Sequence, residues 1–500
     1  MALSTVARLQ YDHTPGVAIT VDVPIDGEQY TLSLQPHSVR APGYQLLIQD
    51  ETGAIVPVEP GPERTLRGEI VDQPGSFVAA SSNEDGLYAR ILMNDGNEYW
   101  IEPVRGLVPG YDAEDHVIYH TDDVYPHGGS CAADQMGHVD PVSKDSAGSG
   151  SGIGTRGSLC TAELACDADF EYYQAHGSSV TNVESQINSI INSMNVQYEG
   201  EVGITHLVTA IVVRTSSNDP YTSSDPGTLL NQFTNEWNSN QGSIQRDVAE
   251  LFTGRNMNGG VIGIAWLSAV CTSSGYNVVE SDFNGNFSCK TDLSAHELGH
   301  NWGADHCSCT SNTMNPFITC ANTFHPSFTI PEIIAFRDSR SCLDCGPLGD
   351  VVYVVMSIKQ GTVLSGDLPE LAASDDQYWI AQSEFLLNNQ GNPRQRVNSV
   401  LVMESPTLSP SAINARVELA ADLQGTKTRF KMRNYTNGTW VVVDGPFTTE
   451  TVDTLHQFSI TNNAASFVNF NSRMRLRILT NELSDTQFNL SIDEMTVTVN

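Results

Sequence analysis

The sequence predicts a multidomain protein with a β-rich N-terminal domain, a central α/β domain and a C-terminal all-β sandwich of jelly-roll-like type. Five hundred residues exceed what one hydrophobic core normally serves. All ten cysteines stand between Cys131 and Cys345, which sets the central part apart from both flanks. Helical periodicity is also confined to that central part, whereas the flanks consist of short strand-like runs separated by turns.

The predicted segments are 1–142, 143–158, 159–346 and 347–500. In the first segment, the run SFVAASSNEDGLYARILMNDGNEYWIEPV alternates apolar and polar residues around Asp-Gly turns, which is typical of antiparallel strands. The second segment, SKDSAGSGSGIGTRGS, is rich in glycine and serine and shows no hydrophobic period. It is predicted to be an exposed, protease-sensitive linker.

The third segment mixes strand and helix patterns. Strands are predicted over residues 161–173, 205–213 and 259–270, and helices over residues 181–194 and 225–237. The first helix has Thr181 and Glu184 at the spacing of a capping box, and the second has Pro226 in its first turn. Helices that alternate with strands indicate an α/β domain.

The fourth segment contains no cysteine and consists mostly of strand-like runs such as SVLVMES, TRFKMRNY and RMRLRILT. Regular short strands with turn signals predict a sandwich. We expect a binding or targeting module without chemistry of its own, with a surface or glycan ligand as its partner. Trp379 and Trp440 are candidates for stacking on sugars, although an isolated tryptophan in a strand is more commonly part of the core.

The charge balance narrows the choice of partner and compartment. The chain has 25 basic and 59 acidic residues, a net charge of −34, which argues against nucleic acid or an anionic membrane as partner. No run approaches the ~18 apolar residues of a transmembrane segment. Ten cysteines in one domain suit disulfides and an extracellular location, so we expect a secreted protein, although no signal peptide is visible in this chain.

The stretch TDLSAHELGHNWGADHC carries the candidate chemistry. In a helix, His296 and His300 lie one turn apart on one face, where both imidazoles can bind one zinc ion (Zn²⁺). Gly303 allows the helix to end in a left-handed turn, which brings His306 back as third ligand. Three protein ligands and one open position define a catalytic zinc site, and Glu297 stands where its carboxylate can reach a water on the metal. Five specified residues in eleven positions make an accidental match improbable.

Together with the downstream SNTMNPF, this motif resembles the metzincin proteases, and HELGHNWGADHC resembles their reprolysin or adamalysin branch, which includes the ADAM-like proteases. The stretches DVAELFTGRNMNGGVIGIAWLSAVC and FTIPEIIAFRDSRSCL resemble the segment leading into that family's substrate-binding edge strand and its closing helix. The N-terminal LRGEIVDQPGSFVAASSNEDGLYARILMNDGNEYWIEP is similar to the reprolysin propeptide. The resemblance covers about two thirds of the chain and implies a propeptide domain over 1–142 and a metzincin catalytic domain over 159–346.

The resemblance also implies roles for individual residues. Met314 is the candidate methionine of the turn beneath the metal, Cys271–Cys342 is the expected disulfide, and Glu163 is the acid that matches a calcium (Ca²⁺) ligand, against the simpler interpretation of a surface glutamate. The substrate-binding candidates are Gly263, Ile264, Ala265, Trp266, Pro316 and Phe317. The strand over 261–269 is expected to take a peptide substrate as an added antiparallel strand, and Trp266 has core packing as its alternative role. The chain departs from the family where Cys307 follows His306 and where the usual Cys-Ile before the turn is missing.

Cys131 has two interpretations. Reprolysin propeptides often use one cysteine to block the open zinc position, and Cys131 stands between the propeptide-like strands and the linker, where such a switch is expected. An ordinary disulfide is the alternative. If Cys131 is reduced, nine cysteines remain and one more is unpaired, for which Cys166 in an apolar strand is the candidate.

The predicted function is that of a secreted zinc-dependent endopeptidase made as a zymogen, with protein or peptide substrates. Glu297 is expected to act as general base on a zinc-activated water. Linker cleavage, for example after Arg156, is expected to release the active enzyme. The alternative is a cell-surface adhesion or glycan-binding protein whose metalloprotease-like domain is not catalytic.

Overall fold

A computed structural model of the chain describes residues 4–71, 73, 76–105, 108, 110–126, 128–133, 159–345, 351–366, 371, 378–387, 390–405, 410, 412–469 and 473–499. The chain divides into two compact units, which consist of residues 1–154 with 159–345 and of residues 155–158 with 346–500. The N-terminal and central regions therefore share one unit. The predicted linker, with Arg156, lies outside the described residues.

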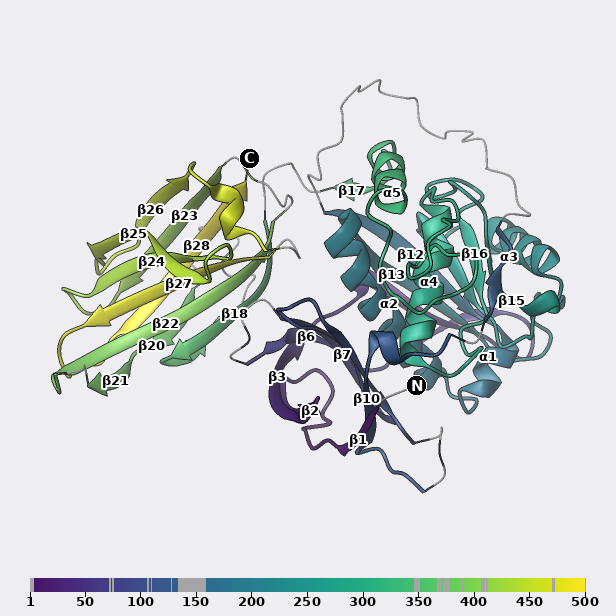
Figure 1. The fold of residues 1–500 in the computed structure, drawn as a ribbon, viewed down its shortest axis with the longest axis horizontal. Helices are drawn as coiled ribbons and strands as arrows, with labels where there is room; N and C mark the ends of the chain where they lie inside the picture. Colours follow the sequence, from purple (N-terminus) through teal and green to yellow (C-terminus); the bar gives the residue numbers. More distant parts are fainter. Residues whose placement is uncertain are drawn as a thin grey trace. The chain divides into compact units, whose positions relative to one another are not determined.

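The N-terminal region forms an antiparallel sheet of eight strands, counted over the described residues (Figure 1). In spatial order the strands are β1 (Thr5–Arg8), β10 (Asp115–His120), β9 (Glu98–Pro103), β8 (Gly86–Leu92), β7 (Phe77–Asn83), β6 (Thr65–Ile70), β3 (Glu28–Pro36) and β2 (Ile19–Ile25). Alternation of buried and exposed residues along β2 shows the pleat that the sequence pattern predicts. This sheet has its own apolar core.

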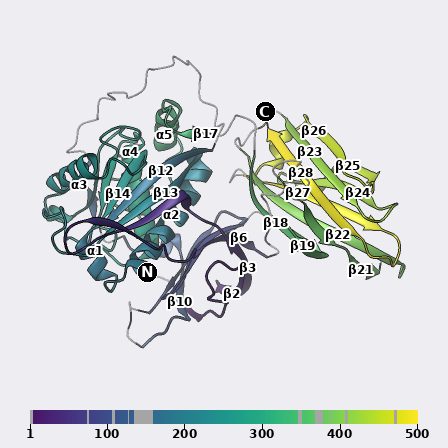
Figure 2. The same cartoon turned by 180° about the vertical axis from the view of Figure 1, so that it is seen from behind.

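The central sheet is mostly parallel and has nine strands in the described part of the chain (Figure 2). Its order is β11 (Ser130–Cys131), β15 (Val261–Ala265), β16 (Tyr276–Val279), β14 (Val248–Phe252), β12 (Cys160–Ala168), β13 (Ile204–Arg214), β4 (Arg40–Gln49) and β5 (Ile55–Val58), with β17 (Asp344–Cys345) beside β12. Three of these strands, β4, β5 and β11, come from the N-terminal region. That region therefore continues the central sheet at one edge and covers its opposite edge strand β15.

The helices of this unit are α1 (Phe170–Ala175), α2 (Val180–Val202), α3 (Pro226–Asn240), α4 (Phe287–Asn301) and α5 (Thr329–Asp338). The predicted strand over 161–173 is thus too long, because the chain turns into α1 at Phe170. Helix α3 begins with Pro226 in its first turn, as predicted. Helix α2 packs against β13 of the central sheet and against β7 of the N-terminal sheet, which joins the two sheets into one unit.

The predicted capping box of α2 is wrong. The N-cap is Ser179, whose side chain accepts a hydrogen bond from the Asn182 amide. Glu184 is buried and receives hydrogen bonds from Arg40 Nη2 (2.9 Å), Tyr44 Oη (2.9 Å) and the Gly61 amide (2.8 Å). Glu184 therefore binds the N-terminal region to helix α2. Its contacts are distant in the sequence, so the local spacing of residues could not predict them.

The second unit is a sandwich of two antiparallel sheets, as its strand pattern predicts (Figure 1). One sheet contains β18 (Val352–Gln360), β22 (Pro393–Glu404), β27 (Arg473–Glu482), β24 (Lys427–Asn434) and β25 (Thr439–Thr448), with β21 (Glu384–Leu387) beside β22. The other contains β19 (Thr362–Ser365), β20 (Trp379–Gln382), β28 (Asn489–Val499), β23 (Ile413–Ala421) and β26 (Thr454–Ile460). Trp379 is buried in the core between them.

All ten cysteines lie in the described part of the chain. The disulfides are Cys160–Cys345, Cys271–Cys342, Cys289–Cys320 and Cys307–Cys309. Cys271–Cys342 is the pair that the family resemblance implied. Cys131 and Cys166 are not part of a disulfide, so the disulfide alternative for Cys131 is wrong and Cys166 is the buried thiol that the cysteine count required. Over the residues described, no helix is long and apolar enough to cross a bilayer.

Candidate active site

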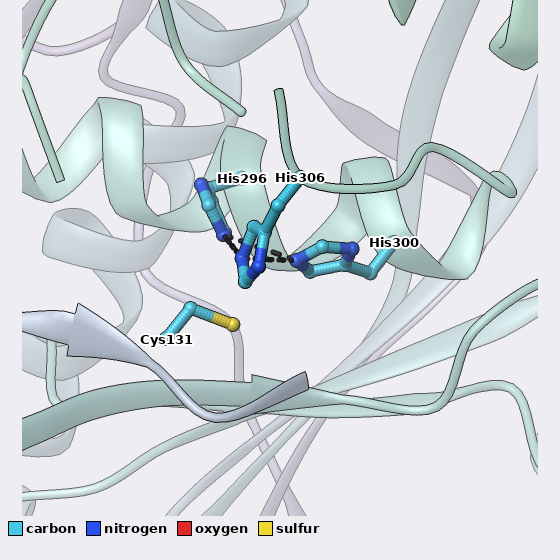
Figure 3. A group of neighbouring side chains, drawn as sticks. All are labelled: Cys131, His296, His300 and His306. Carbon is cyan, nitrogen blue, oxygen red and sulfur yellow. Dashed lines mark hydrogen bonds between the residues drawn. The ribbon is translucent and has the colours of Figure 1, made fainter. Parts of the chain in front are cut away.

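The three histidines of the motif converge on one point (Figure 3). His296 and His300 stand on helix α4, which begins at an N-cap formed by Asn286 and ends just before Gly303 (φ +86°). The left-handed turn at Gly303, predicted from the motif, returns the chain so that His306 faces the helix. The Nε2 atoms of the three rings lie 3.1 to 3.2 Å from one another.

The donor set fits a tetrahedral zinc ion. His296 Nδ1 lies 2.6 Å from the Thr313 carbonyl and His300 Nδ1 lies 2.7 Å from the Ala304 carbonyl. These carbonyls accept hydrogen bonds from the Nδ1–H groups and leave both Nε2 lone pairs aimed inward. Zinc–nitrogen distances of ~2.0–2.1 Å place tetrahedral ligands about 3.3–3.4 Å apart, close to the separations found here. Burial, with His306 nearby, lowers the pKa of His296 to about 3, which keeps its ring in the neutral, ligating form.

Glu297 lies next to the first ligand and is fully buried in this structure. A Cβ atom on Gly263 of strand β15 would lie 2.0 Å from Glu297 Oε1, so the carboxylate lies directly against the backbone of that strand. Burial raises the pKa of Glu297 well above its usual range, and the nearby Glu250 adds to this increase. Glu250 on β14 is itself fully buried, and burial raises its pKa to about 8. The sequence pattern did not single out Glu250, because a glutamate within a strand is normally on the surface.

Cys131 completes the cluster. Its Sγ atom and one nitrogen from each of His296, His300 and His306 all lie within 4.8 Å of one another (Figure 3). The sulfur also lies 3.4 Å from Glu297 Oε2 and 3.2 Å from the Ala133 amide. The structure therefore brings a thiol from the N-terminal region to the open side of the three imidazoles.

The segment around Cys131 lies between strand β15 and the chain at residues 316–318. On one side, β11 pairs with β15 in the parallel direction, Cys131 opposite Gly263, and the Ala132 amide donates to the Gly263 carbonyl (3.0 Å). On the other side, the Cys131 amide donates to the Pro316 carbonyl, and the Ile318 amide donates to the Gly129 carbonyl, both at 3.0 Å. Segment 129–132 therefore forms main-chain hydrogen bonds both with β15 and with the chain at residues 316–318.

The predicted substrate-binding residues differ in the exposure of their side chains. Ile264 and Ala265 are fully buried, so their side chains face the core and only their backbone can meet a ligand. Trp266 is half-buried and donates from Nε1 to Thr234 Oγ1 (3.0 Å), which favours a packing role over direct contact. Pro316 is half-buried, whereas Phe317 is 57% exposed, so its side chain is accessible to a ligand.

Met314 packs against helix α4, which carries two of the candidate metal ligands. It is fully buried, and a Cβ atom on Gly299 would lie 2.5 Å from its sulfur. Gly299 stands between the two helical histidines, so the absence of a side chain there lets Met314 pack against the helix backbone. The family resemblance pointed to Met314, but its contact with Gly299, and the hydrogen bonds that Thr313 and Ala304 carbonyls accept from the histidines, appear only in the folded structure.

The calcium prediction for Glu163 gains no support. Its carboxylate accepts a hydrogen bond from Gln245 Nε2 (2.9 Å). Among the described residues, the groups that could hold a metal do not include Glu163. His206 has a structural role: it is fully buried between Asn195 and Trp302 Nε1, which donates to His206 Nε2 (3.0 Å).

Sequence comparisons agree with this geometry. Residues 158–330 match metallo-peptidase family M12, of the reprolysin type. Residues 407–494 match the N-terminal glycosyl-hydrolase-114-associated domain.

Curated relatives include three metalloproteinases. The chain is 26% identical over 299 residues to human disintegrin and metalloproteinase domain-containing protein 10, covering 49% of this chain and 40% of the relative. It is 26% identical over 287 residues to mouse disintegrin and metalloproteinase domain-containing protein 19 (55% and 30%). It is 26% identical over 201 residues to the Naja atra zinc metalloproteinase-disintegrin-like atrase-A (36% and 32%). The chain thus spans less than half the length of each of these relatives. Residues 158–330 form a reprolysin-like metallopeptidase domain of family M12.

Proposed function

We propose that the protein is a secreted zinc-dependent endopeptidase made as a zymogen. The observation that carries this proposal is the convergence of three imidazole nitrogens beside a carboxylate, at the edge of a strand able to pair with a peptide. His296, His300 and His306 would hold the metal. Four disulfides support export, because they persist in oxidising compartments.

When bound, zinc supplies Lewis acidity toward a peptide carbonyl and lowers the pKa of a water. Glu297 takes the proton from the attacking water and delivers it to the leaving amine. Its position against Gly263 places this proton transfer next to the strand that holds the substrate. The backbone of β15 binds the substrate as an added strand, and the chain at Pro316 and Phe317 forms the opposite wall.

Latency follows from the same contacts. Segment 129–132 occupies the main-chain groups of both cleft walls, and Cys131 supplies a fourth donor on the open side of the histidines. A substrate added to β15 is expected to run antiparallel, whereas β11 runs parallel to it. Segment 129–132 therefore blocks the edge of β15 that a substrate would use. Its backbone runs in the direction opposite to that expected for a substrate.

The protease proposal is tested by casein hydrolysis after the linker is clipped with trypsin. Hydrolysis is expected to stop with a chelator, to return with zinc, and to be lost in Glu297→Ala, which should retain one equivalent of metal because Glu297 is not a ligand. Normal cleavage by Glu297→Ala would overturn the mechanism. An inert wild-type protein that still binds zinc would favour the alternative of a non-catalytic adhesion or glycan-binding protein.

The latency proposal is tested with Cys131→Ala in the unclipped chain. Loss of the thiol donor is expected to raise basal casein hydrolysis above that of the wild type, although segment 129–132 still hinders substrate entry. Cys166→Ala is the matched control, because Cys166 is a buried thiol that is not part of the cluster of Cys131 and the three histidines. Equal basal rates in the Cys131 and Cys166 variants would contradict the switch.

A further inference from the structure

The outer face of one sheet of the C-terminal sandwich is strongly basic. On β24, alternate residues Thr428, Phe430 and Met432 are fully buried, so the residues between them point outward. The outward positions of β22, β24 and β27 include six half-buried cations, which we call the basic face: Arg394, Arg396, Arg429, Lys431, Arg433 and Arg477.

This concentration runs against the composition of the chain. Residues 346–500 hold 11 basic and 16 acidic residues, whereas residues 1–345 hold 14 basic and 43 acidic ones. Within the described part of the chain, none of the six cations of the basic face forms an ion pair. Arg396 instead donates to the neutral side chains of Asn481 (2.8 Å) and Gln360 (3.0 Å). Arg473 and Glu404 of the same sheet do form an ion pair, and Glu384 stands opposite Arg396, but the six cations of the basic face have no ion-pair partner among the described residues.

The cations of the basic face also repel one another. Lys431 and Arg477 are direct cross-strand partners, and like charges at such positions destabilise a sheet. Burial lowers the pKa of Lys431, and Arg429, Arg477 and Arg396 lower it further. The Nε atoms of Arg394, Arg429, Arg433 and Arg477 are buried and have no hydrogen-bond partner among the described residues. The free protein thus keeps like-charge repulsion on this face and unsatisfied Nε groups at its base.

An aromatic ring lies beside the cations. Trp440 on β25 pairs with Arg433, and the guanidinium carbon of Arg477 lies 4.0 Å from the centre of the Trp440 ring. Unlike the buried Trp379, Trp440 is only half-buried. An indole next to guanidinium groups offers an apolar stacking surface and charged donors at one place.

We propose that the basic face is a binding site for an acidic polysaccharide, whose carboxylate or sulfate groups pair with the cations while a sugar ring stacks on Trp440. Guanidinium groups bind such oxyanions in bidentate geometry. Duplex DNA is the less suitable polyanion, for two reasons. The face is a pleated sheet without a projecting helix or ribbon to enter a groove. DNA also carries one charge per ~1.7 Å, so the strongly acidic remainder of the chain repels it more than a polymer with one charge per one or two sugars.

The test uses the full chain with Glu297→Ala, which prevents self-digestion, and measures binding of polygalacturonate by calorimetry at low ionic strength. Neutral dextran and a short DNA duplex are the comparison ligands. Polygalacturonate is expected to bind, dextran is not, and binding should weaken as salt rises to about 0.15 M. The triple change Lys431→Gln, Arg433→Gln and Arg477→Gln is expected to lower the affinity about tenfold or more, because three charged contacts are lost. Trp440→Ala should lower it as well.

Arg416→Gln is the matched control, because Arg416 lies on the other sheet, on β23, and is 50% exposed next to Glu494. Its affinity should equal that of the parent. Thermal unfolding checks that each variant folds; if the triple variant does not, Lys431→Gln alone should show a partial loss. Absent binding, unchanged affinity of the folded variants, or equal binding of dextran would overturn the proposal. Tighter binding of DNA than of polygalacturonate would assign the face to nucleic acid instead.

Discussion

Gly263 shows how a single residue prepares the candidate active site. It stands on the edge strand β15, and a Cβ atom there would lie 2.0 Å from Glu297 Oε1 and 2.6 Å from Glu297 Cδ. No L side chain fits at this position unless the carboxylate moves. The glycine therefore allows the proposed general base to lie against the strand that would hold a substrate.

Gly263→Ala is expected to reduce casein hydrolysis by the clipped enzyme about 100-fold, because a displacement of about 1 Å at a reacting group has an effect of that order. Zinc content should not change, since the three histidines are untouched. Gly200→Ala is the control, because a Cβ atom at Gly200 on helix α2 would meet nothing within 4 Å. Wild-type activity in Gly263→Ala would show that the carboxylate can lie elsewhere and still function.

At the scale of elements, the N-terminal region is integrated with the protease domain through several contacts. Strand β4 extends the central sheet parallel to β13. The buried Arg67 forms an ion pair with Glu199 of helix α2. Glu102 on β9 accepts hydrogen bonds from the Phe287 amide (3.0 Å) and Asn286 Nδ2 (3.1 Å), so it contacts the N-terminus of the helix that carries two candidate metal ligands.

Glu102 is expected to make stability depend on pH. Burial raises its pKa from 4.5 to about 7. The folded protein therefore keeps a proton that the unfolded chain releases between these values, and this contribution to stability is lost as the pH rises from about 4.5 to about 7. In Glu102→Gln, which cannot ionise, the free energy of unfolding should fall less over this range.

Urea unfolding of the two proteins at the two ends of that pH range measures this difference. Glu51→Gln, a change at an exposed glutamate, should behave as the wild type. If Glu102→Gln and the wild type lose stability equally as the pH rises, Glu102 is not the source of the effect.

At the scale of the whole molecule, the two compact units have separate hydrophobic cores. The candidate metal ligands all belong to the first unit. A ligand that binds only a folded state stabilises the unit that holds it, by RT ln(1 + [L]/Kd).

Calorimetry of the full chain is therefore expected to show two unfolding transitions, and removal of zinc with a chelator should lower the midpoint of one of them only. The isolated segment 351–500 identifies the transition that should not move. A single transition, or an equal shift of both, would show that the units unfold together.

The sequence alone was sufficient for features encoded by short-range spacing. The motif HExxHxxGxxH predicted three converging imidazoles, and the left-handed turn at Gly303 was predicted from the same eleven residues. Periodicity also located β13 and α3, because each buries a regular pattern of side chains. The position of Cys131 between the propeptide-like strands and the Gly/Ser-rich linker predicted its role. The sequence did not predict its distance from the histidines.

Only the tertiary structure decided which distant segments meet. Glu184 was predicted to cap a helix but accepts a hydrogen bond from Arg40, and β4 pairs with β13, which lies more than a hundred residues later in the chain. The pairing of β11 with β15 and the basic face likewise arise from strands that are distant in the sequence. The physical reason is that local spacing determines helix faces and strand pleats, whereas the free energy of burying apolar area and pairing main-chain groups depends on which surfaces become neighbours.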